Sequence, residues 1–142
     1  MEKIFEIINA AAANPMLQLV VLAIVFDTIF GVTRAIKEHK FNSCVGIDGA
    51  IRKISMVISL VFLLIADQII AVNLIAFVPE TIRSYIGLDA VGLTGFFSLL
   101  YIAYEIVSIL KNMTLCGLPV RIIWDKLKAI LGKYTAELPD DE

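Results

Sequence analysis

Histidine and cysteine are scarce in this chain, and their scarcity excludes several kinds of site. The only histidine is His39, and the two cysteines are Cys44 and Cys116. No two of these residues have the spacing of a zinc-ligand pair, so we expect no metal site. Two cysteines are also too few for the disulfide framework of a small secreted protein.

The chain also lacks the motifs of common enzymes and phosphate-binding proteins. It has no glycine-rich phosphate loop, no helical pair of histidines and no paired Asp/Glu motif. His39 lies in a charged segment, where a solvated side chain is a better interpretation than a catalytic one. We therefore expect no catalytic residue and no cofactor, and we predict that the protein is not an enzyme.

Charged residues are few, at 18%, whereas apolar residues make up 59% of the 142 residues and the mean hydropathy is +0.87. An average globular protein is roughly half apolar and a quarter charged. The apolar excess is concentrated in three runs, each near the roughly 20 residues that a helix needs to cross a bilayer. The sequence therefore predicts a single-domain, all-α membrane protein with three transmembrane helices.

The predicted domain has eight segments in chain order. Residues 1–14 form an amphipathic helix, because Ile4, Phe5 and Ile8 recur at helical spacing, with a frayed terminus as the alternative. The three spans cover 15–35, 54–77 and 91–110, with a basic cytoplasmic loop at 36–53 and an external loop at 78–90. Residues 119–134 form an amphipathic helix on the membrane surface with Trp124 at the headgroups, and 135–142 form an acidic tail.

The first span carries small side chains and one carboxylate on a single face. Ala23, Asp27, Gly31 and Ala35 recur every four residues, so another helix can approach closely there. Arg34 lies seven residues after Asp27, on the same face, and we expect it to neutralise the carboxylate in part. The same stripe offers a close-packing surface to a second copy of the chain.

The other two spans also contain ionisable residues. Asp67 is predicted near the middle of the second span, with no basic residue within two turns, so it must face protein or water, or be protonated. The third span has a polar seam at intervals of four and three residues, which we expect to face a neighbour or water and not lipid. The seam consists of Thr94, Ser98, Tyr101, Glu105, Ser108 and Asn112.

These polar groups allow two interpretations. They either line a polar path or an assembly surface, or each is satisfied locally within a compact three-helix bundle. Three helices cannot enclose a wide aqueous channel alone, so we expect homo-oligomers whose polar faces are hidden in single copies. The candidate pore or assembly residues are Asp27, Gly31, Asp67, Ser98, Tyr101, Glu105 and Ser108.

Lysine and arginine are distributed unevenly between the two sides of the predicted spans. The N-terminal segment has one and the external loop has one, whereas the first loop and the C-terminal segment have five each. Positive charge favours the cytoplasmic side, so the N-terminus is predicted outside and the C-terminus in the cytoplasm. We expect these cations to contact the bilayer, including its anionic lipids, and we expect no nucleic-acid partner.

Two stretches resemble a known family. The run FDTIFGVTRAIKEHKFNSCVGIDGAIRK at 26–53 resembles the hallmark of the toxin-secretion and phage-lysis holins, and YEIVSILKNMTLCGLP at 104–119 is a second matching stretch. The resemblance implies a bacterial cytoplasmic-membrane protein that oligomerises into lesions, through which an endolysin or a toxin without a signal peptide passes. It implies no catalytic residue. Besides Asp27 and Gly31, the motif positions, of unassigned role, are Arg34, Lys40, Asn42, Ser43, Gly46, Asp48, Gly49, Arg52 and Lys53.

Two other functions fit the same residues. A small proton-coupled transporter would use Asp67 or Glu105 as its relay. A membrane scaffold would instead bind a cytoplasmic partner on the helix at 119–134.

Overall fold

The computed structural model describes residues 2–39, 43–87 and 90–133, and within them the chain is helical and has no strand. The helices are α1 (Glu2–Ala13), α2 (Pro15–Lys37), α3 (Ser43–Ile69), α4 (Glu80–Ile86), α5 (Leu93–Leu115) and α6 (Arg121–Leu131). Three segments are long and apolar enough to cross a membrane: Pro15–Lys37, Gly46–Ile69 and Leu93–Leu115. The predicted all-α fold with three candidate spans is confirmed.

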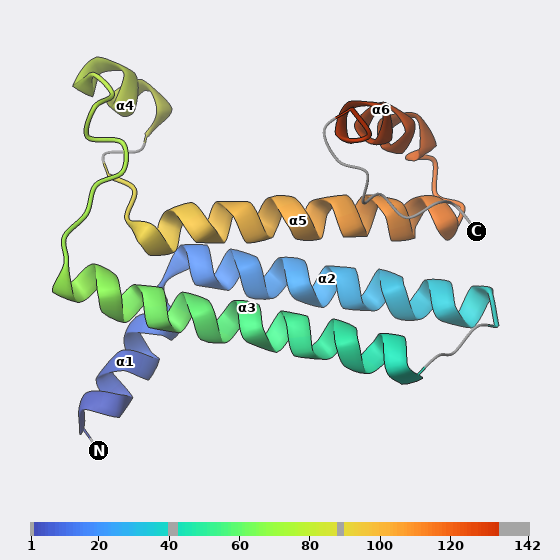
Figure 1. Ribbon diagram of the computed structural model, residues 1–142, viewed down its shortest axis with the longest axis horizontal. Coiled ribbons are helices and arrows are strands. Elements are labelled where there is room, and N and C mark those ends of the chain that lie inside the picture. The colour runs from blue at the N-terminus through green and yellow to red at the C-terminus, as the bar shows by residue number, and fades with distance from the viewer. Residues whose placement is uncertain (1, 40–42, 88–89, 134–142) are drawn as a thin grey trace.

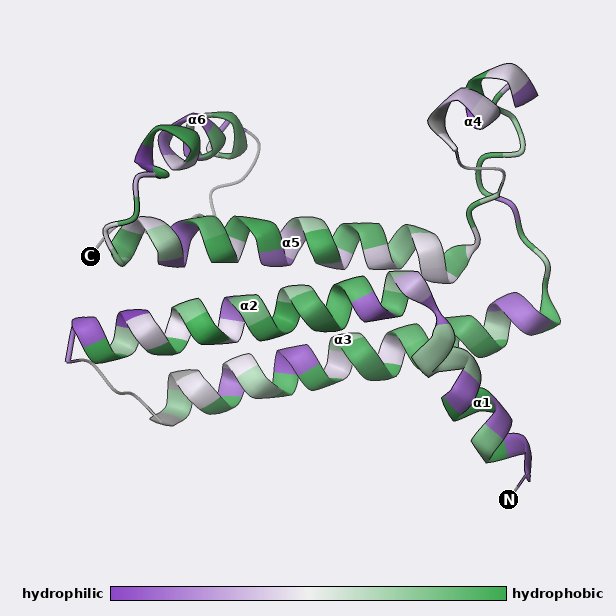
Figure 2. Cartoon of the chain, turned by 180° about the vertical axis from the view of Figure 1, so that it is seen from behind, coloured by the Kyte–Doolittle hydropathy of each residue, from purple (hydrophilic) through white to green (hydrophobic). Residues whose placement is uncertain are grey.

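The three long helices lie side by side, and the short helices lie at the ends of this bundle (Figure 1). Helix α2 packs most extensively on α5, α3 packs on α5 as well, and α2 and α3 contact each other less. The core is formed by Val20 and Leu60, which are fully buried, with Phe97 and Tyr101 packed against them. Hydrophobic residues predominate along α2 and α5, whereas α1 carries hydrophilic residues among its hydrophobic ones (Figure 2).

A side-chain cap marks the start of α2. The Asn14 side-chain oxygen accepts hydrogen bonds from the backbone amides of Met16, at 2.9 Å, and Leu17, at 3.2 Å. Pro15 occupies the first helical position, where its missing amide hydrogen is not needed. These two residues separate α1 from α2 and let the two helices take different directions.

The second long helix is displaced toward the N-terminus from the predicted span at 54–77. Helix α3 begins at Ser43, inside the predicted loop at 36–53, and ends at Ile69. Gly46 and Gly49, whose residue type is frequent in turns, are helical. After the end of α3 the Asn73 side-chain oxygen accepts hydrogen bonds from the backbone amides of Ile75 and Val91. These bonds offer the backbone an alternative to the helix, although the sequence there is apolar.

The remaining predicted segments differ less from the observed helices. Helix α5 continues to Leu115, beyond the expected end at 110. Helix α6 lies within 119–134, and α4 lies within the loop predicted at 78–90. Lys40, Asn42 and the acidic segment 135–142 lie outside the described residues, and Ser43 is described only as the first residue of α3.

Candidate functional site

The polar seam of α5 faces the other two long helices. Thr94, Ser98 and Glu105 are 3%, 0% and 0% exposed. Tyr101, Ser108 and Asn112 are partly buried. On the opposite side of the helix Leu99 and Leu100 are about half exposed, at 46% and 50%. The seam is therefore hidden inside a single copy of the chain.

Asp27 joins all three long helices through its carboxylate. Lys53 Nζ of α3 lies 2.8 Å from Asp27 Oδ2, and Asn112 Nδ2 of α5 donates to Oδ1 at 3.0 Å. The expected neutralisation by Arg34 is wrong, because the Arg34 Nε atom pairs with Glu38 Oε1 at 3.0 Å. The sequence placed Lys53 in a loop, and only the early start of α3 brings it to the level of Asp27.

Glu105 lies near this group and interacts with the Asp27 carboxylate, but in a geometry that does not meet the criteria of a hydrogen bond. Neither of its carboxyl oxygens has a hydrogen-bond partner within the described part of the chain. Asp27, Lys53 and Arg52 act on it electrostatically. The Ser98 hydroxyl is also buried, and none of the described residues is its hydrogen-bond partner. Buried polar atoms in native proteins are nearly always hydrogen-bonded, so this part of the seam is energetically unfavourable in the closed chain.

Another part of the seam is satisfied. The Tyr101 hydroxyl and the Ser59 hydroxyl of α3 lie 2.9 Å apart, and Ser59 also donates to the Met56 carbonyl at 2.8 Å. The local-bundle interpretation therefore holds for Asp27 and Tyr101. It fails for Ser98 and Glu105.

Asp67 lies in the last turn of α3 and not in the middle of a span. Its two carboxylate oxygens accept the backbone amides of Leu93 and Thr94, each at 2.8 Å, and so cap the start of α5. A carboxylate at a helix N-terminus is favoured by the free amides and by the helix dipole. Asp67 thus faces protein, and its contacts are those of a helix cap. The transporter hypothesis requires a proton relay at this position instead.

Gly92 allows this cap to form. A Cβ atom at Gly92 would lie only 2.8 Å from Asp67 Oδ2 and 3.0 Å from the carboxyl carbon. Its backbone, with φ −79° and ψ −178°, is open to any residue, so the need for glycine is steric. Nothing in the sequence signalled this contact, because Asp67 and Gly92 are 25 residues apart and α4 lies between them.

The small-residue stripe of α2 is occupied within the chain. A Cβ atom at Gly31 would meet the Asn112 side chain of α5 at 3.7 Å, and Asp27 on the same stripe is bonded to that side chain. The prediction that another helix approaches this face closely is correct, but that helix is α5 of the same molecule. The stripe is consequently not available to a second copy while the bundle is closed.

The two stretches that resemble the holin family contact each other. Lys37 Nζ donates to the Leu115 carbonyl at 3.2 Å, and the Arg52 guanidinium carbon lies 5.2 Å from the Tyr104 ring centroid. The Cys116 thiol lies 3.8 Å from the Phe30 carbonyl oxygen. Of the described motif positions, Asp48 is exposed, and nothing lies within 4 Å of a Cβ atom at Gly46 or Gly49.

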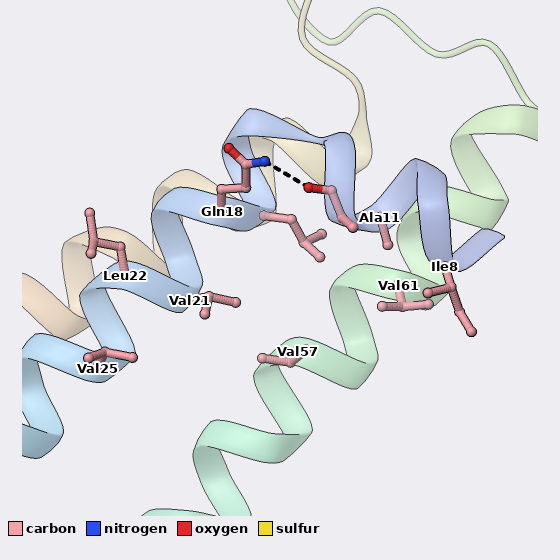
Figure 3. Close-up of a pocket in the computed structure, with 10 residues that line it drawn as sticks. Ile8, Ala11, Gln18, Val21, Leu22, Val25, Val57 and Val61 are labelled. Atoms are coloured by element: carbon pink, nitrogen blue, oxygen red, sulfur yellow. Dashed lines mark hydrogen bonds between the residues drawn. The ribbon is translucent and has the colours of Figure 1, made fainter. Parts of the chain in front are cut away.

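An apolar groove of about 500 Å³ opens where α1 meets α2 and α3 (Figure 3). Val21, Val25 and Val57 are among its lining residues, and Gln18 Nε2 closes one edge by donating to the Ala12 carbonyl at 2.7 Å. The groove offers apolar contact alone. Among the described residues no group of three or more His, Cys, Asp or Glu could hold a metal ion.

Comparisons with known proteins agree with the resemblance of the two stretches. A family model described as the bacteriophage holin family matches residues 8–135. The chain is 44% identical over 132 residues to the holin-like protein TcdE of Clostridioides difficile, across 92% of this chain and 80% of that protein. No solved structure matches the chain.

Proposed function

This chain belongs to the bacteriophage holin family, and on that basis we propose that several copies assemble into a lesion in the bacterial cytoplasmic membrane. The chain is a holin, and the family points to a non-enzymatic function. The observation that carries the proposal is the buried seam of α5, in which Ser98 and Glu105 have polar atoms without a hydrogen-bond partner among the described residues. Such atoms are satisfied if copies rearrange so that the seam faces water.

The energetics of the seam favour two states. Each polar group buried without a partner costs about 1–3 kcal/mol, so a single closed copy holds an unfavourable free energy that assembly around water would release. A lone copy in lipid has no water to offer these groups, and therefore keeps them inside the bundle. The closed bundle is then the form in which the protein accumulates, and the lesion forms when copies meet.

The proposed orientation has the N-terminus outside and the C-terminus in the cytoplasm. It rests on the excess of lysine and arginine at one end of the bundle. Arg34 and Lys37 lie in the last turn of α2, at that end of the bundle. That end also leads into α6, so we propose that these cations contact the cytoplasmic leaflet and its anionic lipids.

The proposed cargo is an endolysin or a toxin that lacks a signal peptide. Support comes from the two stretches at 26–53 and 104–119, which resemble the toxin-secretion and phage-lysis holins. Sequencing the neighbouring genes distinguishes the two: a gene for a cell-wall hydrolase would support the endolysin, and a gene for a toxin without a signal peptide would support the toxin.

Expression in a bacterium tests the proposal. The membrane potential is followed with a voltage-sensitive dye, and a cytoplasmic reporter enzyme is assayed in the medium. We expect loss of potential together with release of the reporter enzyme. Intact potential and no release at high expression would contradict a lesion, and loss of potential without enzyme release would limit the protein to passing small ions.

A further inference from the structure

Helix α6 has apolar residues in two different environments, because one is buried against the bundle and others are exposed. Trp124 is 4% exposed and is the buried residue of this helix. Among the described helices α5 is the one that α6 contacts, so Trp124 packs on α5. Ile123 and Ile130 remain 56% and 58% exposed.

The placement of α6 relates these side chains to the bilayer. Gly117, with φ +87°, reverses the chain after α5, and α6 then lies beside the last turns of α5 and not beyond its end. Figure 1 shows α6 nearly along its own axis while α5 runs across the view, so the two helices cross. If α5 spans the membrane, a helix that crosses it beside its last turns is placed to lie along the membrane surface.

The helical period divides α6 into a lipid side and a water side. Successive residues turn by about 100° in an α-helix, so Ile123 and Asp125 point to opposite sides of the direction in which Trp124 points. Ile130 lies seven residues after Ile123 and shares its side. Arg121 lies four residues before Asp125, shares the other side, and pairs with it at 3.9 Å as an exposed ion pair. The exposed isoleucines Ile123 and Ile130 therefore share one side, and the Arg121–Asp125 ion pair lies on the other.

The charge of the segment identifies its partner. Residues 121–133 contain four cations (Arg121, Lys126, Lys128 and Lys133) and one acid (Asp125), a net charge of +3. Lys126 and Lys133 each follow an exposed isoleucine by three residues, so both lysines border the apolar side, where their chains can reach the phosphates. We propose that α6 docks its Ile123 and Ile130 side on the anionic surface of the bilayer that holds the chain, with Trp124 anchoring it to α5.

Fluorescent labels on the full chain test this docking. In a Cys44→Ser, Cys116→Ser background, one cysteine is introduced as Ile123→Cys or as Asp125→Cys and labelled with an environment-sensitive fluorophore. The protein is reconstituted in vesicles of phosphatidylcholine with phosphatidylglycerol in both leaflets, so that either insertion direction gives the same reading. Lipids brominated in the acyl chains should quench the label at 123 severalfold more than the label at 125.

Two changes test the role of charge. The substitutions Lys126→Gln and Lys133→Gln should each lower the ratio of docked to undocked helix by about fivefold. Removing phosphatidylglycerol should lower the same ratio. Equal quenching at 123 and 125, or quenching at 123 that persists in pure phosphatidylcholine, would overturn the proposal. Quenching by aqueous iodide that is as strong at 123 as at 125 would overturn it too. That result would favour a cytoplasmic protein as the partner.

The inference rests on the membrane insertion of α5 and not on the proposed lesion. The readout needs a single inserted copy and no permeability change, so docking can fail while lesions form, and lesions can fail while docking persists.

Discussion

The ammonium group of Lys53 lies 2.8 Å from the carboxylate of Asp27, inside the bundle and between two helices that otherwise contact each other sparingly. The two side chains are 15% and 7% exposed, and Lys53 also donates to the Thr28 hydroxyl at 2.7 Å. The pair therefore fixes α3 to α2, while Asn112 ties the same carboxylate to α5.

Replacing Lys53 with methionine should destabilise the bundle by about 3 kcal/mol, because the buried Asp27 carboxylate loses its counter-ion. Unfolding of the purified protein in detergent can be followed by the fluorescence of Trp124, the single tryptophan of the chain. The double variant with Asp27→Asn should recover most of the loss. Arg34→Met should cost less than about 1 kcal/mol, since Arg34 makes a partly exposed pair with Glu38. A larger effect of Arg34→Met than of Lys53→Met would contradict this pairing.

The cap at the start of α5 predicts a compensating pair of substitutions. Asp67→Ala should cost about 1–2 kcal/mol, because the amides of Leu93 and Thr94 lose their acceptor. Gly92→Ala should cost about 1–3 kcal/mol through its contact with the carboxylate. In the Asp67→Ala background the second substitution should cost much less. Hydrogen exchange at Leu93 and Thr94 reports the cap directly, and additive effects of the two changes would argue against the contact.

The spans could be predicted because hydropathy and length are local properties of the sequence. The seam of α5 could be predicted as well, since its residues share one helix and a regular spacing. The partners of Asp27 and Asp67 could not, because they lie 26 and more residues away, on other helices. Lys53 was assigned to a loop because Gly46 and Gly49 suggest turns, although isolated glycines are tolerated within a helix.

The orphaned hydroxyl of Ser98 predicts a stabilising substitution. Ser98→Ala should raise the free energy of unfolding by about 1 kcal/mol, because it removes a buried group that has no hydrogen-bond partner. Ser59→Ala is the matched control, since it removes a hydroxyl bonded to Tyr101 and Met56, and it should destabilise by a similar amount. Thermal unfolding in detergent measures both. A destabilised Ser98→Ala variant would show that the hydroxyl has a partner after all.

The stacking of Arg52 on Tyr104 predicts that the two family stretches stabilise each other. Tyr104→Leu should cost about 0.5–1 kcal/mol, whereas Tyr104→Phe should be close to neutral because it keeps the ring face. In an Arg52→Gln background both substitutions at Tyr104 should have nearly the same small effect. If Tyr104→Leu costs the same stability in the Arg52→Gln background, the loss comes from packing of the ring and not from the contact with Arg52.

Glu105 connects the closed bundle to assembly. Glu105→Leu replaces a fully buried carboxyl group without hydrogen-bond partners by an apolar side chain of similar size. The closed copy should become more stable and the assembled seam less favourable, so cross-linked oligomers should be smaller and loss of membrane potential should come later. Leu99→Ala, at a position 46% exposed on the opposite side of α5, should leave both measurements unchanged. Equal behaviour of the two variants at matched expression would mean that the seam serves the closed bundle alone and that copies assemble through another face.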